Sequence, residues 1–365
     1  MKNIDKVNVL KSTIIKTPIG LLTKLVAEYG ISEKGSISFN EKTLVAVYID
    51  DKKENSKLVY VVVDREGTIE SYKEDDGILP TLFLSPNQEN YVSVIPYHPD
   101  KELEISIPIF NRENTELPKG NRPFVGDFIG TTEYFSIFYD ADIWTDTKPD
   151  KMLAIEFKNG QLKKKNNIKI PFPRDNKIFI SDNEIHLLAI EEEHWIHRQI
   201  DEKGNEIKRR KIQPNHKYFS QIISLSFETE SYILIEDEEG QIILEEIAVN
   251  GTSKSIEFNA MIGSYYNSWQ PVKIAEDTFV TKFNGEFGNG WFTTKKDQLL
   301  ELFYGKGEKG YRNILTNEFL EMDSDQIIIS SVNKTTENNY AVIFYPMTER
   351  NIKNKEIFIL NREIK

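Results

Sequence analysis

A short pattern recurs along this chain: an apolar strand, a polar turn that usually contains glycine, and a second apolar strand. It is clearest in LVYVVVDREGTIESY from Leu58, LAIEFKNGQLKKK from Leu153, WIHRQIDEKGNEIKRRKI from Trp195 and SYILIEDEEGQIILEEI from Ser231. Apolar runs on either side of a Gly-containing turn indicate antiparallel hairpins. A hairpin repeated every few tens of residues restricts the chain to architectures built from repeated small β-sheets.

The spacing of these hairpins sets the number of repeats. Turns are expected near Glu66, Lys101, Asn159, Gly204, Glu239, Asp297 and Arg350. Their mean spacing is about 47 residues, between the periods of WD40 and kelch repeats. No low-complexity linker divides the chain, so one closed all-β domain is expected.

One repeat carries a more specific pattern. From Ile222 to Ile247 the sequence IISLSFETESYILIEDEEGQIILEEI has strand, turn, strand, acidic-Gly turn and strand in that order. This order resembles a WD40-type blade, although the Gly-His and Trp-Asp dipeptides of WD40 repeats are absent. The match is good over this unit and loose over two or three others. The resemblance to β-propellers with degenerate WD40-like blades implies a single propeller of seven blades, with six or eight as the alternatives.

The N-terminal segment follows a different pattern. In TPIGLLTKLVAEYG, Thr17 can cap a helix, Pro18 suits its first position, and Gly30 can end it. Apolar residues recur at helical spacing at Leu21, Leu22, Leu25, Val26 and Tyr29. We predict that residues 1–35 form a short helical or extended segment, with the helix favoured, which packs on or closes the propeller formed by residues 36–365.

Closing a ring of blades requires the first and last blades to be held together. One terminus usually supplies a strand to the other terminus's sheet. The strand-like candidates are VNVLKSTII from Val7 and EIFILNREI from Glu356.

Net charge limits the class of partner. Lys and Arg number 46 against 58 Asp and Glu, which gives −12. An acidic surface repels phosphate backbones and disfavours nucleic acid as a partner, whereas it favours a basic one. Two basic runs, Lys163–Lys165 and Lys208–Lys211, each follow a predicted turn. They are interpreted as solvated outer strands that protect a sheet edge.

Cysteine is absent, which excludes disulfides, thiolate metal sites and cysteine nucleophiles. The first residues, MKNIDKVNVLKSTIIK, lack the apolar core and cleavage site of a signal peptide. No stretch approaches the roughly 20 apolar residues of a membrane helix. We therefore expect a cytoplasmic protein without a membrane span, unless a leader has been removed.

The histidines and the clustered acids are the candidate metal ligands of this sequence. The histidines are His98, His186, His194, His197 and His216. In HWIH, His194 and His197 point to opposite faces of a strand, and the helical HExxH zinc motif is absent. Asp140, Asp142 and Asp146 alternate in a loop, as calcium ligands do, but the EF-hand glycine and distal glutamate are missing. We predict no metal and no cofactor; a weak cation site at these aspartates is the alternative to a polar loop.

Large aromatic residues fall in three expected long loops that would open on one rim, at 139–150, 249–270 and 283–290. Aromatics on exposed loops favour a binding surface because they supply contact area at low entropy cost. The alternative is that they plug the central channel or pack between blades. The predicted site consists of Asp140, Asp142, Trp144, Asp146, Tyr265, Tyr266, Trp269, Glu286 and Trp291.

Two function classes follow, and no catalytic motif decides between them. The first is a non-catalytic binding module or scaffold that engages a protein or peptide partner through this rim. The second is a carbohydrate-active propeller enzyme, with Asp140, Asp142 and Glu286 beside Trp144 and Trp291. The lack of a catalytic motif favours the first. A structural or sensory repeat domain is a third class that the sequence does not separate from it.

Overall fold

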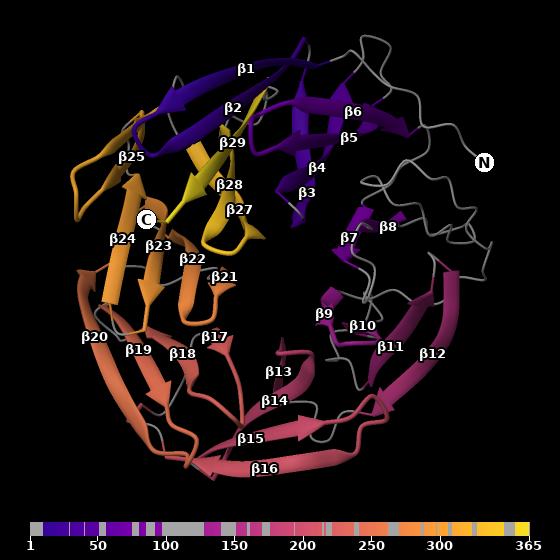
Figure 1. The fold of residues 1–365 in the computed structure, drawn as a ribbon, viewed down its shortest axis with the longest axis vertical. Coiled ribbons are helices and arrows are strands. Elements are labelled where there is room, and N and C mark those ends of the chain that lie inside the picture. Colours follow the sequence, from indigo (N-terminus) through magenta and orange to yellow (C-terminus); the bar gives the residue numbers. More distant parts are fainter. Residues whose placement is uncertain are drawn as a thin grey trace. The chain divides into compact units, whose positions relative to one another are not determined.

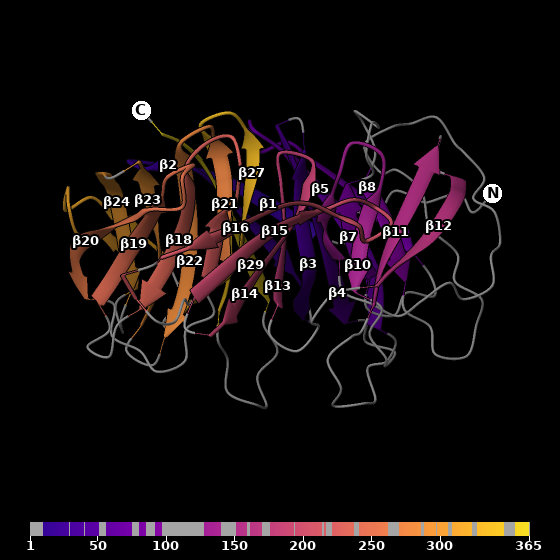
Figure 2. The same ribbon diagram turned by 90° about the horizontal axis from the view of Figure 1, so that it is seen from below.

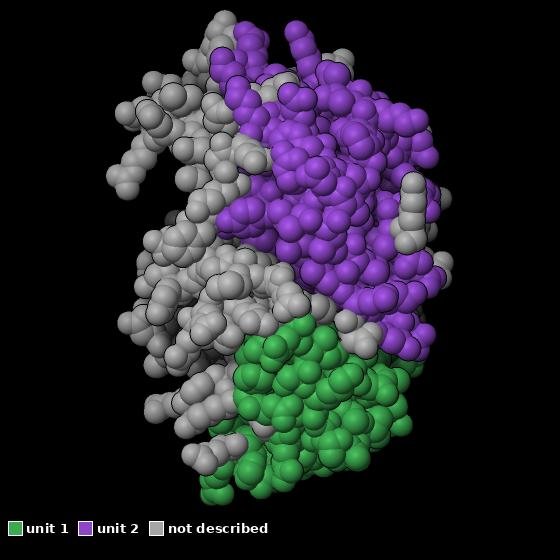
Figure 3. Space-filling model, turned by 90° about the vertical axis from the view of Figure 1, so that its left-hand side faces the viewer, with its two compact units in different colours: residues 1, 79–236, 243–257 green, residues 2–78, 237–242, 258–365 purple. Residues whose placement is uncertain are grey.

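The computed structural model describes a chain built from short β-strands, with no helix among the described residues (Figure 1). The described residues are 10–28, 30–39, 41–50, 56–74, 80–84, 92–96, 128–139, 151–158, 161–169, 176–192, 194–213, 215–216, 221–236, 241–261, 270–285, 288–296, 298–305, 309–322, 327–346 and 355–364. They form two compact units, coloured separately in Figure 3. Unit 1 comprises residues 1, 79–236 and 243–257, and unit 2 comprises residues 2–78, 237–242 and 258–365. The expected all-β class is confirmed.

The described residues of unit 1 form three antiparallel sheets and most of a fourth, of which residues 241–242 and 258–261 belong to unit 2; consecutive strands are neighbours in each (Figure 2). A two-stranded sheet joins β7 (Pro80–Leu84) and β8 (Val92–Pro96). The second consists of β9 (Phe128–Thr131), β10 (Ser136–Tyr139), β11 (Lys151–Lys158) and β12 (Gln161–Lys169). The third consists of β13 (Asn176–Ser181), β14 (Glu184–Glu191), β15 (His194–Ile200) and β16 (Glu206–Ile212). The fourth consists of β17 (Gln221–Ser224), β18 (Ser231–Glu236), β19 (Gln241–Ile247) and β20 (Ser253–Met261).

Three further sheets lie in the described part of unit 2. The first consists of β3 (Ile31–Phe39), β4 (Lys42–Asp50), β5 (Ser56–Asp64) and β6 (Ile69–Glu74). The second runs from β21 (Gln270–Ala275) through β22 (Thr278–Gly285), β23 (Gly288–Lys295), β24 (Gln298–Gly305) and β25 (Gly310–Asn313) to β26 (Phe319–Glu321). The third has the order β1 (Leu10–Thr17), β2 (Gly20–Ala27), β29 (Glu356–Glu363), β28 (Asn339–Pro346) and β27 (Ile327–Thr336).

The central strands are buried on both faces, which explains their nearly continuous apolar sequences. In β4 and β5, residues 44–47 and 58–63 are all buried. Alternate residues of these strands, such as Val45 and Val61, pack with Ile343 of β28 and Ile359 of β29. β-branched residues suit strands that are covered on both faces. Within unit 2 the core therefore lies between the faces of adjacent sheets.

The predicted N-terminal helix is wrong, because residues 20–27 form strand β2. Thr17 donates its hydroxyl hydrogen bond to the carbonyl oxygen of Gly20 at 2.8 Å and so stabilises the hairpin turn between β1 and β2. Thr23, Leu25 and Ala27 are buried with the two-residue period of a strand. A Cβ atom on Gly20 would lie 2.3 Å from the carbonyl oxygen of Asn361, so glycine permits the close approach of β2 and β29. The extended alternative is the one that the structure adopts.

The prediction that one terminus adds a strand to the other's sheet is confirmed, and of the two candidates EIFILNREI supplies that strand as β29. The candidate VNVLKSTII overlaps β1, which pairs with β2 and not with β29. β2 pairs with β29 from Leu21 opposite Asn361 to Val26 opposite Glu356. Arg362 of β29 strengthens this junction, because it donates to the backbone oxygen of Ile19 and forms a bidentate ion pair with Glu301 of β24. β3 begins at Ile31, before the boundary placed at residue 35. The division into residues 1–35 and 36–365 stays a prediction.

Most predicted turns lie between consecutive neighbouring strands. The strands on either side of the predicted turns near Glu66, Asn159, Gly204, Glu239, Asp297 and Arg350 are paired neighbours, although Asn159, Glu239, Asp297 and Arg350 themselves lie outside the described residues. Lys101 also lies outside them, and the strands that flank it, β8 and β9, belong to different sheets. Both basic runs lie on outer strands, β12 and β16, as interpreted. Two expected long loops are wrong in their described parts: residues 253–261 form β20, and residues 283–285 of β22 pair with residues 288–290 of β23.

Candidate functional site

The residues of the predicted rim site fall into two groups. Trp291 is described and fully buried; the others lie outside the described residues, namely Asp140, Asp142, Trp144, Asp146, Tyr265, Tyr266, Trp269 and Glu286. The ring of Trp291 stacks on Phe303 with centroids 4.4 Å apart, and its Nε1 donates to the hydroxyl of Tyr340 at 3.0 Å. Trp291 is therefore a core residue on the central strand β23 and takes no part in an exposed rim surface.

A polar pocket of about 250 Å³ lies within unit 2. It is lined by Ser32 and Glu33 of β3, Lys282 of β22, Ile328, Ile329 and Ser330 of β27, and Tyr345 of β28. Ser32 is exposed, whereas Lys282 is only 8% exposed. The pocket therefore leads from a solvated serine to a buried ammonium group.

Two β-bulges shape the walls of this pocket. The register of β27 against β28 shifts between Ile329 and Ser331, which leaves Ser330 as the extra residue. The register of β3 against β4 shifts between Glu33 and Gly35, directly beside Glu33. A bulge removes a residue from the regular ladder and redirects its groups, and bulges are frequent beside binding sites. Here the carbonyl oxygen of Ser330 accepts a hydrogen bond from Nζ of Lys282 at 2.6 Å.

Ser330 holds both charged groups of the pocket. Its carbonyl oxygen accepts from Lys282, and its hydroxyl donates to Oε2 of Glu33 at 2.6 Å. Burial lowers the pKa of Lys282, while the Glu33 carboxylate acts in the opposite direction. Burial, and then the Glu33 carboxylate, raise the pKa of Tyr345. The pocket thus presents one negative group, one desolvated positive group and a phenol that stays protonated.

Polar contacts continue along β3 and β27 beyond the pocket. The hydroxyls of Ser36 and Ser331 are hydrogen-bonded to each other. The amide of Asn333 donates to Ser36 at 3.1 Å and to Ser331 at 3.2 Å. This seam of side-chain hydrogen bonds fixes β3 beside β27, so the pocket walls are held by more than the pocket residues themselves.

Sequence reasoning missed this pocket because its residues come from four strands. The sequence does contain one sign of the pocket, because Lys282 interrupts the mainly apolar segment TFVTKF of a central strand. A lysine in a strand that is covered on both faces must be buried, and buried lysines are rare without a partner. The bulges at Ser330 and beside Glu33 left no comparable pattern.

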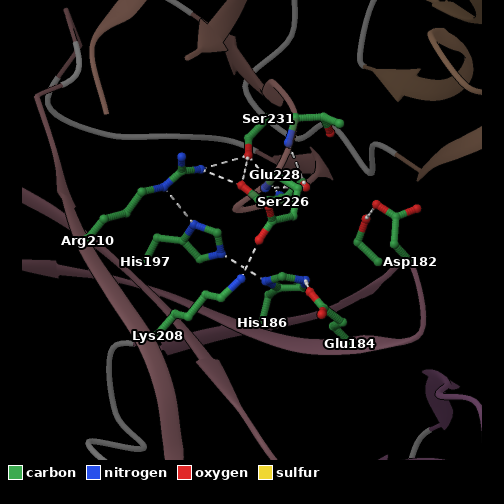
Figure 4. A network of polar contacts seen from close by, with 11 residues as sticks. Asp182, Glu184, His186, His197, Lys208, Arg210, Ser226, Glu228 and Ser231 are labelled. Atoms are coloured by element: carbon green, nitrogen blue, oxygen red, sulfur yellow. Dashed lines mark hydrogen bonds and ion pairs between the residues drawn. The ribbon is translucent and has the colours of Figure 1, made fainter. Parts of the chain in front are cut away.

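A second polar cluster lies in unit 1, on β14, β15 and β16 and the turn before β18 (Figure 4). Arg210 donates from Nε to Nδ1 of His197 at 3.1 Å. Its other four N–H groups contact the backbone oxygens of Ser226, Ala248 and Val249 and the hydroxyl of Ser231. Arg210 thereby departs from the interpretation of its basic run as fully solvated, whereas Lys208, Arg209 and Lys211 are exposed.

The arginine determines the tautomers of two buried histidines. Guanidinium groups only donate, so Nδ1 of His197 must accept, and the hydrogen of neutral His197 lies on Nε2. Nε2 of His197 is 2.9 Å from Nδ1 of His186 and donates to it. The hydrogen of neutral His186 then lies on Nε2, which is 3.6 Å from a carboxylate oxygen of Glu184. The result is a directional chain from Arg210 through two imidazoles towards Glu184.

This cluster is a buried structural network. Both imidazoles are fully buried, and Phe227 stacks on His197 with centroids 4.1 Å apart. Burial lowers the pKa of His186 to about 4; burial together with the neighbouring His186 and Arg210 lowers the pKa of His197 to about 2. Both ring nitrogens of His197 are hydrogen-bonded, one to Arg210 and one to His186. Among the described residues, no group of three or more acidic, histidine or cysteine side chains could hold a metal ion.

Comparisons with known proteins concern the fold. No protein-family model and no curated protein matches the sequence. Among solved structures, the β-propeller domain of the Trilobed protease from Pyrococcus furiosus matches with a TM-score of 0.51 and 8% identity, over 92% of this chain and 98% of that domain. The chain has a β-propeller fold.

Two further propeller-containing structures match at similar levels. Prolyl oligopeptidase B from Galerina marginata has a TM-score of 0.51 and 9% identity, over 92% of this chain. A puromycin-hydrolyzing peptidase from Mycobacterium tuberculosis has a TM-score of 0.50 and 8% identity, also over 92% of this chain. This propeller spans about half of those chains, 55% and 54%. At such low identity the likeness extends to the fold alone, and the expected number of seven blades stays a prediction.

One finding bears on membranes. Among the residues that the structure describes, no helix is long and apolar enough to cross a bilayer.

Proposed function

We propose that this propeller is a non-catalytic binding module that engages a protein or peptide partner and holds a polar group of that partner in the pocket of unit 2. The observation that carries the proposal is the desolvated Lys282 beside Glu33, both fixed by Ser330 at a β-bulge. Burying a lysine is costly unless the site recovers the energy. A ligand group that pairs with these charges recovers part of it.

The chemistry of the pocket supports binding over glycoside hydrolysis. Hydrolysis of that class needs two carboxyl groups about 5 to 9.5 Å apart. Of the seven lining residues, Glu33 is the one carboxylate. The carboxylates that the enzyme hypothesis requires, Asp140, Asp142 and Glu286, lie outside the described residues, so that hypothesis gains no support from this site.

The aromatic loops that carry Trp144, Tyr266 and Trp269 stay a separate prediction for partner binding, because they lie outside the described residues. The cytoplasmic location likewise stays an expectation. The net charge of −12 favours a basic partner, because it raises the rate at which cationic groups meet the surface.

The test is selection from a pool of random heptapeptides by the purified protein. We expect a subset of peptides to be enriched by the unaltered protein and to lose about tenfold or more of that enrichment with Lys282→Met. Lys42→Met is the matched control, since Lys42 is exposed on β4 of the same unit. Equal enrichment by the Lys282→Met variant, or no enrichment by the unaltered protein, would refute the proposed function.

A further inference from the structure

The pocket of unit 2 can distinguish ligands by how their hydrogen-bond donors and acceptors are placed relative to one another. Glu33 offers a carboxylate, which can accept several hydrogen bonds. Lys282 is an ammonium group with three donors, and Ser330 accepts one of them. Both contact the same residue, so the acceptor and the donor lie close together. A matching ligand therefore needs a donor, preferably cationic, next to an acceptor.

The first residue of a peptide has this arrangement. Its α-ammonium group is separated by one carbon atom from the first carbonyl group. A lysine side chain carries the ammonium without an adjacent acceptor, so it would satisfy Glu33 and leave Lys282 without a ligand contact. A peptide carboxyl terminus would satisfy Lys282 but would place a negative group near Glu33.

The volume of the pocket and the net charge of the protein also favour the amino terminus of a peptide as the ligand. A pocket of about 250 Å³ is slightly below the roughly 300 Å³ at which sites for drug-sized molecules begin, so it suits one or two small residues. The net charge of −12 attracts a cationic chain end and repels an anionic one. Because Ser32 at the pocket opening is exposed, the rest of a peptide can extend from the pocket into solvent past this residue.

We propose that the pocket captures the free amino terminus of a peptide, with Glu33 accepting hydrogen bonds from the α-ammonium group and Lys282 donating to the first carbonyl oxygen. The hydroxyl of Tyr345 is a further donor for that carbonyl. This assignment rests on the proposed function and specifies which part of a peptide ligand enters the pocket.

Three dipeptide probes test the assignment by saturation-transfer NMR and calorimetry at millimolar concentration. Alanyl-alanine amide has only the free amino terminus. N-acetyl-alanyl-alanine amide has neither terminus, and N-acetyl-alanyl-alanine has only the carboxyl terminus. We expect alanyl-alanine amide to bind about tenfold or more tightly than the other two, because a hydrogen-bonded charge pair contributes at least that much. Its affinity should fall as the pH rises through about 8, where the α-ammonium group loses its proton.

Variants separate the two halves of the assignment. Glu33→Gln should remove the preference for the free amino terminus, and Lys282→Met should weaken the binding of alanyl-alanine amide. Lys42→Met should leave both unchanged. Equal affinity for the three probes, preference for N-acetyl-alanyl-alanine, or no binding of any probe would overturn the assignment.

Failure of this assignment differs from failure of the proposed function. If heptapeptides are enriched equally with free and acetylated amino termini, the module binds peptides but not by this end. If alanyl-alanine amide binds while no heptapeptide is enriched, the pocket chemistry is right and the role as a peptide-binding module is wrong.

Discussion

Acidification should destabilise unit 1 through the two buried histidines, His186 and His197. Their pKa values in the folded protein are lowered to about 4 and about 2, against about 6.5 in an unfolded chain. Between pH 6.5 and 4 the unfolded chain therefore binds more protons than the folded one. Stability must then fall as the pH falls through this window.

The size of the effect follows from the unfolded state. At pH 5 both histidines are still mainly neutral in the folded protein, while in the unfolded chain each is about 1.5 pH units below its pKa. One pH unit corresponds to about 1.4 kcal/mol. Each histidine therefore lowers the free energy of unfolding by about 2 kcal/mol, and the pair lowers it by about 4 kcal/mol. The loss is set by the unfolded chain, because both histidines stay mainly neutral in the folded protein at pH 5. A loss of this size is a large fraction of the usual 5–15 kcal/mol of protein stability.

The assay is urea unfolding at pH 7, 6 and 5, followed by tryptophan fluorescence, to which the buried Trp195 on the same strand as His197 contributes. Carboxylates also lose stabilising contacts in acid, so the comparison is with the double variant His186→Gln/His197→Gln. We expect the free energy of unfolding to fall about 4 kcal/mol more in the unaltered protein than in the double variant between pH 7 and 5. His194→Gln is the matched control, because His194 is on the same strand but only partly buried.

A difference below about 1 kcal/mol would refute the reasoning. If the double variant does not fold, NMR titration of the unaltered protein gives the answer directly. The imidazole resonances of His186 and His197 should not shift between pH 7 and 5, and a midpoint near 6.5 for either would contradict the buried, neutral pair.

Three further predictions concern unit 2. Arg362→Met should cost about 3–5 kcal/mol in urea unfolding, because it leaves the buried Glu301 carboxylate without its bidentate partner. Gly20→Ala should separate β2 from β29, since its Cβ would clash with a backbone oxygen, and amide hydrogen exchange should rise in both strands. Trp291→Phe should cost about 1–2 kcal/mol in urea unfolding by removing the donor to the buried Tyr340 hydroxyl.

Each of these has a control. Arg65→Met removes a half-exposed ion pair with Glu363 and should cost less than about 1 kcal/mol. A loss equal to that of Arg362→Met would contradict the role given to Glu301. Slow exchange in β2 after Gly20→Ala would show that the strand tolerates a side chain there. Tyr340→Phe combined with Trp291→Phe should cost less than the sum of the single changes, since both remove one hydrogen bond.

The sheet pattern was predictable because its determinants are local. At the β15–β16 turn, Asp201 accepts backbone hydrogen bonds from Lys203 at 2.9 Å and Asn205 at 2.8 Å, and Gly204 has φ of 87°. These contacts span five residues, so a short window of sequence contains them. The alternation that places His194 and His197 on opposite faces of β15 is local in the same way.

The helix wrongly predicted for residues 20–27 shows that a short window of sequence is not always enough to assign a strand. Leu21, Leu22, Leu25 and Val26 are compatible with one face of a helix and also with a strand. What decides between them is the backbone of β29, which offers β2 a full row of hydrogen bonds from the other end of the chain. Gly20 was the one informative residue, and its role depends on Asn361.

The pocket was not predictable for a related reason. Glu33, Lys282, Ser330 and Tyr345 are brought together by the packing of β3 and β22 against β27 and β28, and the two bulges that aim them are shifts of register between strands. Register is a property of a strand pair. It is set by how two distant segments bury their apolar faces.

The pairing of β2 with β29 also dictates an order of events on the ribosome. Leu21 lies opposite Asn361, so β2 leaves the exit tunnel long before its partner is synthesised. At translation speeds of about 5–20 residues per second, the first hairpin waits roughly 15–70 s with one edge unpaired and with Leu22 and Leu25 uncovered. Throughout that interval its unpaired edge is a target for chaperones and for neighbouring nascent chains, until β29 pairs with β2 and covers it.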